Sequence, residues 1–198
     1  MDKENFRKIA EELMKIPGNT KGSEFLTLKY YIFQKYGKEG VEKVEKEMEK
    51  LGYPISFDKI RPAHWYSEAL NVLSYLVAKE LFGWPDLFEI GYNSPVFSFG
   101  VKVFVKFLPL SLFLKQIPNI WKKFMDFGSL EVSEYNEKEN YVILNLKGYK
   151  FHPLMCSYYK GFFLRMAEFL VKSEKIEVEE KKCVYKGDPY HQWEIKWK

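Results

Sequence analysis

The chain has 198 residues, of which 46% are hydrophobic and 18% aromatic, so it can bury a full core and does not have the composition of a disordered segment. Its 31 basic and 27 acidic residues leave a net charge of +4 without a basic block or a nucleic-acid motif, which argues against a nucleic-acid partner. The two cysteines lie far apart in the sequence and do not form a disulfide framework, which suits a reducing cytoplasm. Abundant Lys and Glu beside few Gln is typical of a thermophilic source.

No signal peptide or membrane span is predicted. The first five residues are mainly charged and polar and lack the apolar region of a signal peptide. The apolar run 96–114 is interrupted by Lys102, Lys106 and Pro109, which argues against a transmembrane helix. We therefore expect a cytoplasmic protein.

Apolar residues at helical spacing predict four helices in the first part of the chain. They cover residues 2–16, a segment from Ser23 to Gly37, residues 39–51 and about 65–82. Ser23 is expected to cap the second helix and Gly37 to end it. The fourth helix is largely apolar, so it should be central.

The stretch 84–114 fits two interpretations. Its valines favour a strand, whereas Ser94-Pro95 suits the first positions of a helix, and we predict a helix to about Phe107. Two further prolines then divide the segment that ends at Phe127 into a short helix and a second helix beginning at about Ile120.

From Leu130 the apolar period changes to two. This alternation predicts a hairpin of strands 130–134 and 141–146, then a helix from Pro153 to about Val171, then a strand at 175–180 and a last hairpin around the turn 186–189. Gly161, in the middle of the helix, indicates close packing against a neighbouring element.

The predicted fold class is α+β, with N-terminal helices followed by a ββαββ unit that forms a four-stranded antiparallel sheet packed by helices. We expect a single domain over residues 1–198. It would consist of an N-terminal helical extension (1–20), a helical part (21–128) and the ββαββ part (129–198).

Three short motifs, in this order, resemble the 4-vinyl reductase domain family, whose superfamily includes haem–nitric-oxide-binding domains and Golgi transport-particle subunits. The motifs are Trp121…Phe127-Gly128, His152-Pro153…Cys156…Gly161 and Cys183…Gly187-Asp188…His191…Trp193. The resemblance spans about residues 20 to 197. It implies a small-molecule-binding or regulatory module.

The resemblance also implies a metal site. Many family members carry three cysteines, thought to hold a metal, at the positions of Cys156, Cys183 and His191, so a histidine replaces the third cysteine here. The haem-binding branch, in contrast, needs a proximal histidine within about residues 117–127 and a Tyr-x-Ser-x-Arg motif. This chain has no histidine in that segment and reads Tyr-Lys-Phe-His-Pro at 149–153, so we expect haem to be improbable.

Three interpretations of the cysteines and the histidine are open. Cys156, Cys183 and His191 could hold zinc, with a fourth position for water or another group; they could be ordinary core residues; or the thiols could have redox chemistry. Strand parity places His191 on the core face with Trp193, whereas Cys183 reaches that face only if the strand before it contains a bulge near Lys181-Lys182.

The function that we predict is the binding of an apolar or amphipathic small molecule by a sensor-like or regulatory domain. The expected pocket is lined by Trp65, Tyr66, Phe99, Val103, Phe107, Tyr159, Phe163 and Met166. No nucleophile–base pair, phosphate-binding glycine loop or paired-carboxylate motif points to an enzyme. The alternatives are a scaffold or dimerisation subunit, with a homodimer or another protein as its partner, and an accessory protein of tetrapyrrole (vinyl) reduction.

Overall fold

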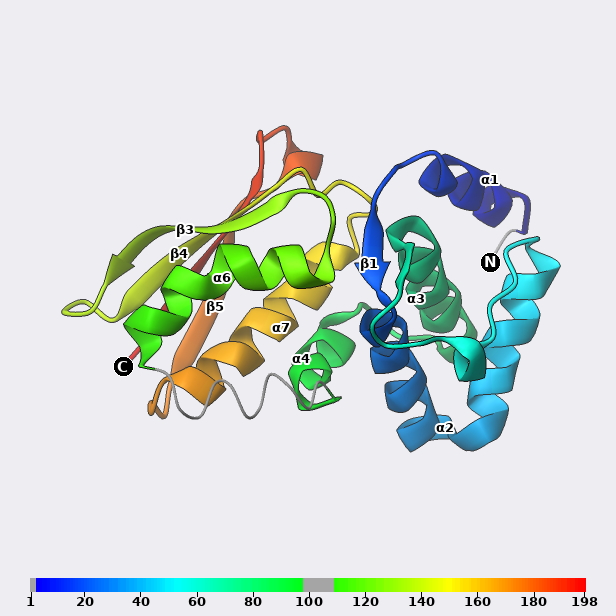
Figure 1. The fold of residues 1–198 in the computed structure, drawn as a ribbon, viewed down its shortest axis with the longest axis horizontal. Helices are drawn as coiled ribbons and strands as arrows, with labels where there is room; N and C mark the ends of the chain where they lie inside the picture. The colour runs from blue at the N-terminus through cyan, green and yellow to red at the C-terminus, as the bar shows by residue number, and fades with distance from the viewer. Residues whose placement is uncertain (1–2, 98–108) are drawn as a thin grey trace. The chain divides into compact units, whose positions relative to one another are not determined.

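The computed structural model describes residues 3–97 and 109–198 (Figure 1). The chain divides into two compact units, Met1–Leu87 and Phe88–Lys198, and each is described by itself. The end of the helix predicted to reach Phe107 lies outside the described residues, as do the candidate ligand-binding residues Phe99, Val103 and Phe107. The expectation of a single domain over the whole chain stays a prediction.

The N-terminal unit is built around one buried helix. Its elements are α1 (Lys3–Met14), β1 (Asn19–Lys21), α2 (Gly22–Lys50), the short 3-10 helix η1 (Phe57–Lys59), β2 (Trp65–Ser67) and α3 (Glu68–Phe82). Strand β1 pairs antiparallel with β2. The helix α3 is buried along most of its length, and α1, α2 and both strands contact it, as its apolar sequence predicts.

The predicted helix boundaries in this unit are confirmed at Gly37 and corrected at Ser23. Gly37 has φ 64° and ψ −165° inside α2, which interrupts the helical backbone where the sequence predicted an end. Ser23 does not cap α2, because Lys21 occupies the N-cap position and no side chain caps the helix there. The side chain of Ser67 caps α3 instead, accepting a hydrogen bond from the Leu70 amide.

The C-terminal unit contains the predicted four-stranded antiparallel sheet, and the α+β fold class is confirmed. Its elements are α4 (Phe88–Phe97), α6 (Leu110–Phe124), β3 (Ser129–Asn136), β4 (Tyr141–Lys147), α7 (Met155–Leu170), β5 (Ile176–Lys182), the short 3-10 helix η2 (Val184–Lys186) and β6 (His191–Trp197). The strands lie in the order β3-β4-β6-β5 (Figure 1).

Two helices cover one face of this sheet. The helix α6 contacts β3 and α7 contacts β5 and β6, and Trp121 of α6 lies 6.2 Å from Tyr159 of α7, ring centre to ring centre. Trp193 of β6 is fully buried beneath α7, where Tyr159 and Phe163 pack on it. His191 and Ile195 share its burial, which confirms the inward parity predicted for β6.

Glycines allow α4 and α7 to approach closely. A Cβ atom placed on Gly161 would lie 2.2 Å from the carbonyl oxygen of Phe88, and one placed on Gly91 would lie 1.9 Å from that of Tyr158. Any side chain at either position would therefore force the helices apart. The mid-helix glycine of α7 has the packing role that the sequence indicated.

Proline placement was predicted less well. Pro95 lies inside α4 and not at its start, and Pro118 lies inside one continuous helix, α6, where two helices were expected. Both positions lack a backbone N–H donor, so one helical hydrogen bond is lost at each without ending the helix. In the described segments 3–97 and 109–198, no helix has both the length and the apolar character that a membrane crossing requires.

We expect Gly161→Ala to lower the free energy of unfolding by about 1–3 kcal/mol, because the added methyl group meets the Phe88 carbonyl. An unobstructed Gly-to-Ala change within a helix has the opposite sign and stabilises by about 1 kcal/mol. Urea denaturation measures the effect, and Lys160→Ala, at an exposed position of the same helix, is the matched control. A more stable Gly161→Ala variant would show that the contact is absent.

Stability should also depend on pH through Glu24. Burial raises the pKa of this carboxyl group to about 7, partly offset by a hydrogen bond from the Ser23 hydroxyl. Because the pKa is higher in the folded state, the unfolded chain releases the proton first, and stability falls as pH rises from about 4.5 to 7. Glu24→Gln should therefore raise the free energy of unfolding at pH 8 by on the order of 1–3 kcal/mol and by much less at pH 4.5. An equal effect at both pH values, or the same effect in the exposed control Glu39→Gln, would contradict this assignment.

Candidate metal centre

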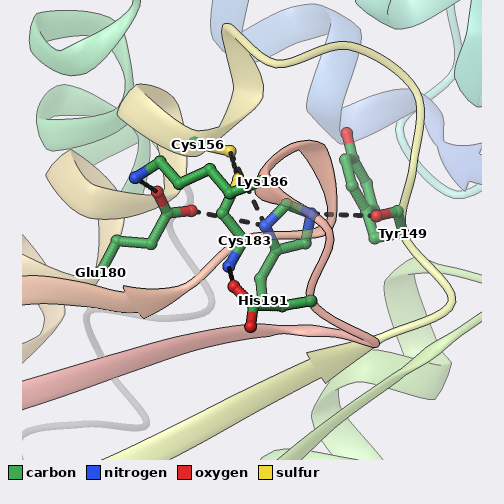
Figure 2. Close-up of polar contacts among 7 residues, drawn as sticks. Tyr149, Cys156, Glu180, Cys183, Lys186 and His191 are labelled. Atoms are coloured by element: carbon green, nitrogen blue, oxygen red, sulfur yellow. Dashed lines mark hydrogen bonds and ion pairs between the residues drawn. The ribbon is translucent and has the colours of Figure 1, made fainter.

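Four side chains with metal-binding atoms converge at one end of the C-terminal unit (Figure 2). Cys156 lies in the first turn of α7, Glu180 near the end of β5, Cys183 directly after β5 and His191 at the start of β6. Their ligand atoms all lie within 4.8 Å of one another. The structure thus brings together the three predicted residues and adds a carboxylate.

The imidazole of His191 presents a lone pair to this cluster. Its Nε2 lies 3.1 Å from the backbone oxygen of Tyr149, which can only accept, so Nε2 carries the proton. In the neutral ring Nδ1 is then unprotonated, and it faces the sulfur of Cys156 and the carboxylate of Glu180. A histidine held by a backbone carbonyl through its second nitrogen is the usual arrangement of a metal ligand.

Three of the six ligand-to-ligand distances are close to the edges of a tetrahedron around one zinc ion. With Zn–S bonds of about 2.3 Å and Zn–N and Zn–O bonds of about 2.0–2.2 Å, tetrahedral geometry places two sulfurs about 3.8 Å apart, sulfur and nitrogen about 3.5 Å, and nitrogen and oxygen about 3.4 Å. The structure has 3.7 Å between the two sulfurs, 3.7 Å between the Cys156 sulfur and His191 Nδ1, and 3.4 Å between that nitrogen and Glu180 Oε1.

The electrostatics of the cluster favour a cation. Burial raises the pKa of the Cys156 thiol, and the charge of Glu180 and the neighbouring Cys183 raise it further. A bound divalent ion has the opposite effect and lowers the pKa of the thiol, because it stabilises thiolate and carboxylate together. The other oxygen of Glu180, Oε2, lies 3.6 Å from the ammonium group of Lys186, which leaves Oε1 directed at His191.

A bulge turns Cys183 toward the cluster. The pairing of β5 with β6 shifts register between Glu180 and Lys182, so Lys181 is the extra residue, and the bulge predicted from the sequence is confirmed. Cys183 is buried, and its backbone amide donates a 2.8 Å hydrogen bond to the carboxylate of Asp188. Residues 183–185 do not form a hairpin arm as expected, because the chain there makes a turn and a 3-10 helix.

Glu180 was missed by the sequence reasoning, although a signal was present. It has the same parity in β5 as Ile176 and Val178, which places a carboxylate on the core-facing side of the strand. It also lies three residues before Cys183, so one strand end supplies two candidate ligands. A charged residue at an apolar position beside a candidate ligand therefore indicates a further candidate ligand.

The structure describes five of the predicted ligand-pocket residues, three in the C-terminal unit and two in the N-terminal unit. Tyr159, Phe163 and Met166 of α7 are buried in the core of the C-terminal unit. In the N-terminal unit Trp65 is 44% exposed and lies beneath the ammonium group of Lys21, whereas the Tyr66 hydroxyl accepts a hydrogen bond from the Arg61 amide.

The space enclosed beside the candidate metal ligands is too small to hold a water molecule. It is lined by Tyr149, His152, Met155, Cys156, Tyr159, His191 and Trp193. Small-molecule sites usually measure about 300–1,000 Å³, so a porphyrin does not fit among these residues. The indole N–H of Trp193 is buried and has no acceptor among the described residues.

The fold is shared with haem–nitric-oxide-binding (H-NOX) domains. An H-NOX protein from S. oneidensis in its Fe(II)NO state matches with a TM-score of 0.65 and 14% identity over 90% of this chain and 99% of that one. A structure from a study of haem distortion in the H-NOX family matches at 0.63 and 17% over 90% and 95%. An oxygen-binding H-NOX domain related to soluble guanylate cyclases matches at 0.59 and 16% over 89% and 92%. No family model and no curated protein sequence matches the chain.

These matches establish the fold class and correct one expectation. The resemblance to the haem–nitric-oxide-binding superfamily is confirmed at the level of fold, whereas membership of the 4-vinyl reductase family stays a prediction. The expectation that haem is improbable is wrong for this fold class, which includes domains studied for their haem. That expectation was based on motif residues that this chain lacks. Such residues bind the haem, whereas the fold is determined by the packing of the core.

We expect Asp188→Ala to destabilise the loop before β6 by about 1–3 kcal/mol, because the Cys183 amide loses a charged acceptor. Asp188→Asn keeps an acceptor oxygen at the same place and should cost less. Amide hydrogen exchange at Cys183 provides the measurement. Equal exchange in the parent and in Asp188→Ala would show that the bond does not hold the turn.

Proposed function

We propose that the chain is a ligand-binding domain of the H-NOX fold class whose C-terminal unit is stabilised by one zinc ion. Cys156, Glu180, Cys183 and His191 are its four protein ligands. The observation that carries the proposal is the agreement of three ligand-to-ligand distances with the edges of a zinc tetrahedron.

The donor set favours zinc over harder ions. Two thiolates and an imidazole are soft or borderline ligands, which Mg²⁺ and Ca²⁺ do not select. Four protein ligands close the coordination shell, as in structural zinc sites, and leave no position for a catalytic water. The ion would join the first turn of α7 to both strands of the last hairpin, so its role is to hold these elements together and not to catalyse a reaction.

The proposed ligand is an apolar or amphipathic small molecule, and haem is a candidate. Support comes from the fold shared with H-NOX domains and from the high aromatic content of the chain. The candidate ligand-binding residues remain Trp65, Tyr66, Phe99, Val103, Phe107, Tyr159, Phe163 and Met166. Membership of the 4-vinyl reductase family and a cytoplasmic location belong to the same proposal.

The zinc site predicts one zinc per chain by elemental analysis of protein purified without chelators. Cys156→Ser, Cys183→Ser and His191→Ala should each lose the metal, and Glu180→Gln should weaken binding by roughly 10-fold or more because a neutral amide oxygen is a poorer ligand. His64→Ala is the control, since this exposed histidine lies in the N-terminal unit. Full occupancy in the double variant Cys156→Ser/Cys183→Ser would refute the assignment.

Haem binding is tested separately by adding haemin to the purified protein. A bound haem gives a saturable Soret shift at one equivalent and a mass increase of one haem in native mass spectrometry. The same spectra, recorded on protein taken directly from cells, reveal any other copurifying ligand. If the native mass equals that of the bare chain and haemin gives no Soret shift, haem is excluded as the ligand. A scaffold subunit is then the better-supported function.

One observation favours the second candidate function, a scaffold or dimerisation subunit. Large apolar side chains are exposed on the N-terminal unit, among them Tyr30, Phe33 and Tyr36 of α2 and Leu81 of α3, with exposed fractions from 39% to 53%. A homodimer would cover such a surface. Light scattering at high micromolar concentration distinguishes a dimer from a monomer, and Phe33→Ser should shift the equilibrium toward monomer if α2 is the interface.

A further inference from the structure

We propose that the hydroxyl group of Tyr185 donates a hydrogen bond to the thiolate sulfurs of the metal centre and thereby strengthens the hold of the centre on its ion. Tyr185 is a positioning residue in this role, because it acts on the metal through Cys156 and Cys183. The inference deepens the proposed function and rests on it, since the hydrogen bond requires metal-bound thiolates.

The hydroxyl group of Tyr185 is a buried donor beside the centre. Tyr185 belongs to η2, which begins directly after Cys183. Its ring lies next to the imidazole of His191, with the two ring centres 5.8 Å apart. Its hydroxyl oxygen is buried and has no hydrogen-bond partner within the described segments 3–97 and 109–198. Because a buried tyrosine hydroxyl ordinarily has a partner, this group is available as a donor to the metal centre.

The hydroxyl group also lies within electrostatic reach of both sulfurs. Burial raises the pKa of Tyr185, and negative charge on Cys156 and on Cys183 raises this pKa further. The hydroxyl group therefore keeps its proton at neutral pH when the sulfurs are thiolates. Since a thiolate has no proton to donate, the hydroxyl group faces it as the donor.

Backbone amides around the two cysteines are engaged elsewhere. The amides of Lys186 and Asp188 donate to the carbonyl oxygen of Cys183, at 2.9 and 3.2 Å. The amide of Cys183 donates to the carboxylate of Asp188, and that of Cys156 donates to a carbonyl oxygen of the preceding loop at 3.1 Å. These amides do not serve the sulfurs, so a side-chain donor such as the Tyr185 hydroxyl takes their place.

The charge of the loaded centre makes such a donor favourable. Two thiolates and one carboxylate bring three negative charges against the two positive charges of zinc, so one negative charge remains. The helix η2 supplies groups for both kinds of ligand, because Lys186 places its ammonium group 3.6 Å from Glu180 Oε2 and Tyr185 directly precedes it. Loss of a partner outside the ligand shell typically lowers metal affinity by about 10- to 100-fold.

The experiment compares Tyr185→Phe, which removes the hydroxyl group and keeps the ring, with the parent. Tyr190→Phe is the matched control, because this tyrosine lies in the same loop and its hydroxyl accepts a hydrogen bond from Lys182 at 3.0 Å. Competition with a chromophoric chelator should give a zinc affinity about 10-fold lower in Tyr185→Phe. In cobalt-substituted protein, the thiolate-to-cobalt charge-transfer band should move to longer wavelength, because a sulfur that loses a hydrogen bond gives up its electron more readily. The control should match the parent in both measurements.

Urea denaturation gives a third readout, whose sign distinguishes the hydrogen bond from packing. Without metal, Tyr185→Phe should unfold at a higher urea midpoint than the parent, because a buried hydroxyl group without a partner is removed. With zinc, the order should reverse, because the parent binds the ion more tightly and gains more stability from it.

Distinct outcomes separate this inference from the proposed function. If the parent binds one zinc while Tyr185→Phe has the parent's zinc affinity and cobalt spectrum, this inference is overturned and the zinc proposal stands. An equal loss of stability with and without zinc would also overturn it, because it would show a packing role alone. If the parent binds neither zinc nor cobalt, the proposed function is refuted and the hydrogen bond is refuted with it.

Discussion

Four groups that carry lone pairs are held against one another at the start of α7, and this is the constraint around which the C-terminal unit is arranged. His191 is oriented by the backbone of Tyr149, Glu180 by its strand and by Lys186, and Cys183 by the hydrogen bond to Asp188. Such groups repel one another when ionised and are costly to bury. A divalent cation would remove both penalties, and the helix and the hairpin would then share that ion at their junction.

The core beneath this junction explains why the ligands are so well placed. Trp193 is fully buried two residues after His191, and Tyr159 lies three residues after Cys156, with the two rings 6.0 Å apart. The close approach of α4 at Gly161 holds α7 from its other side. Rigid neighbours of this kind hold the four side chains in place, so little reorganisation would be needed for a metal to bind.

Local pattern predicted much of the fold. The change of apolar period at Leu130 located β3 and β4, and the alternation in β6 placed His191 inward, because a strand that buries one face must alternate. The three-residue strands β1 and β2 could not be predicted, since a pairing this short leaves no periodic signal. Pro95 and Pro118 misled the prediction because packing, which the sequence does not display, outweighs the loss of one helical hydrogen bond. Three of the four candidate ligands were identified, and Glu180 was not, because strand acids are ordinarily exposed.

X-ray absorption at the zinc edge, on protein reconstituted with one equivalent of zinc, tests the central claim most directly. The account predicts a four-coordinate first shell with two sulfur scatterers at about 2.3 Å and two nitrogen or oxygen scatterers at about 2.0–2.1 Å, and imidazole scattering from one histidine. In Glu180→Ala one light scatterer should be replaced by water or lost while both sulfurs remain. A shell without sulfur, or six oxygen or nitrogen scatterers, would contradict the assignment of Cys156, Glu180, Cys183 and His191 as the metal centre.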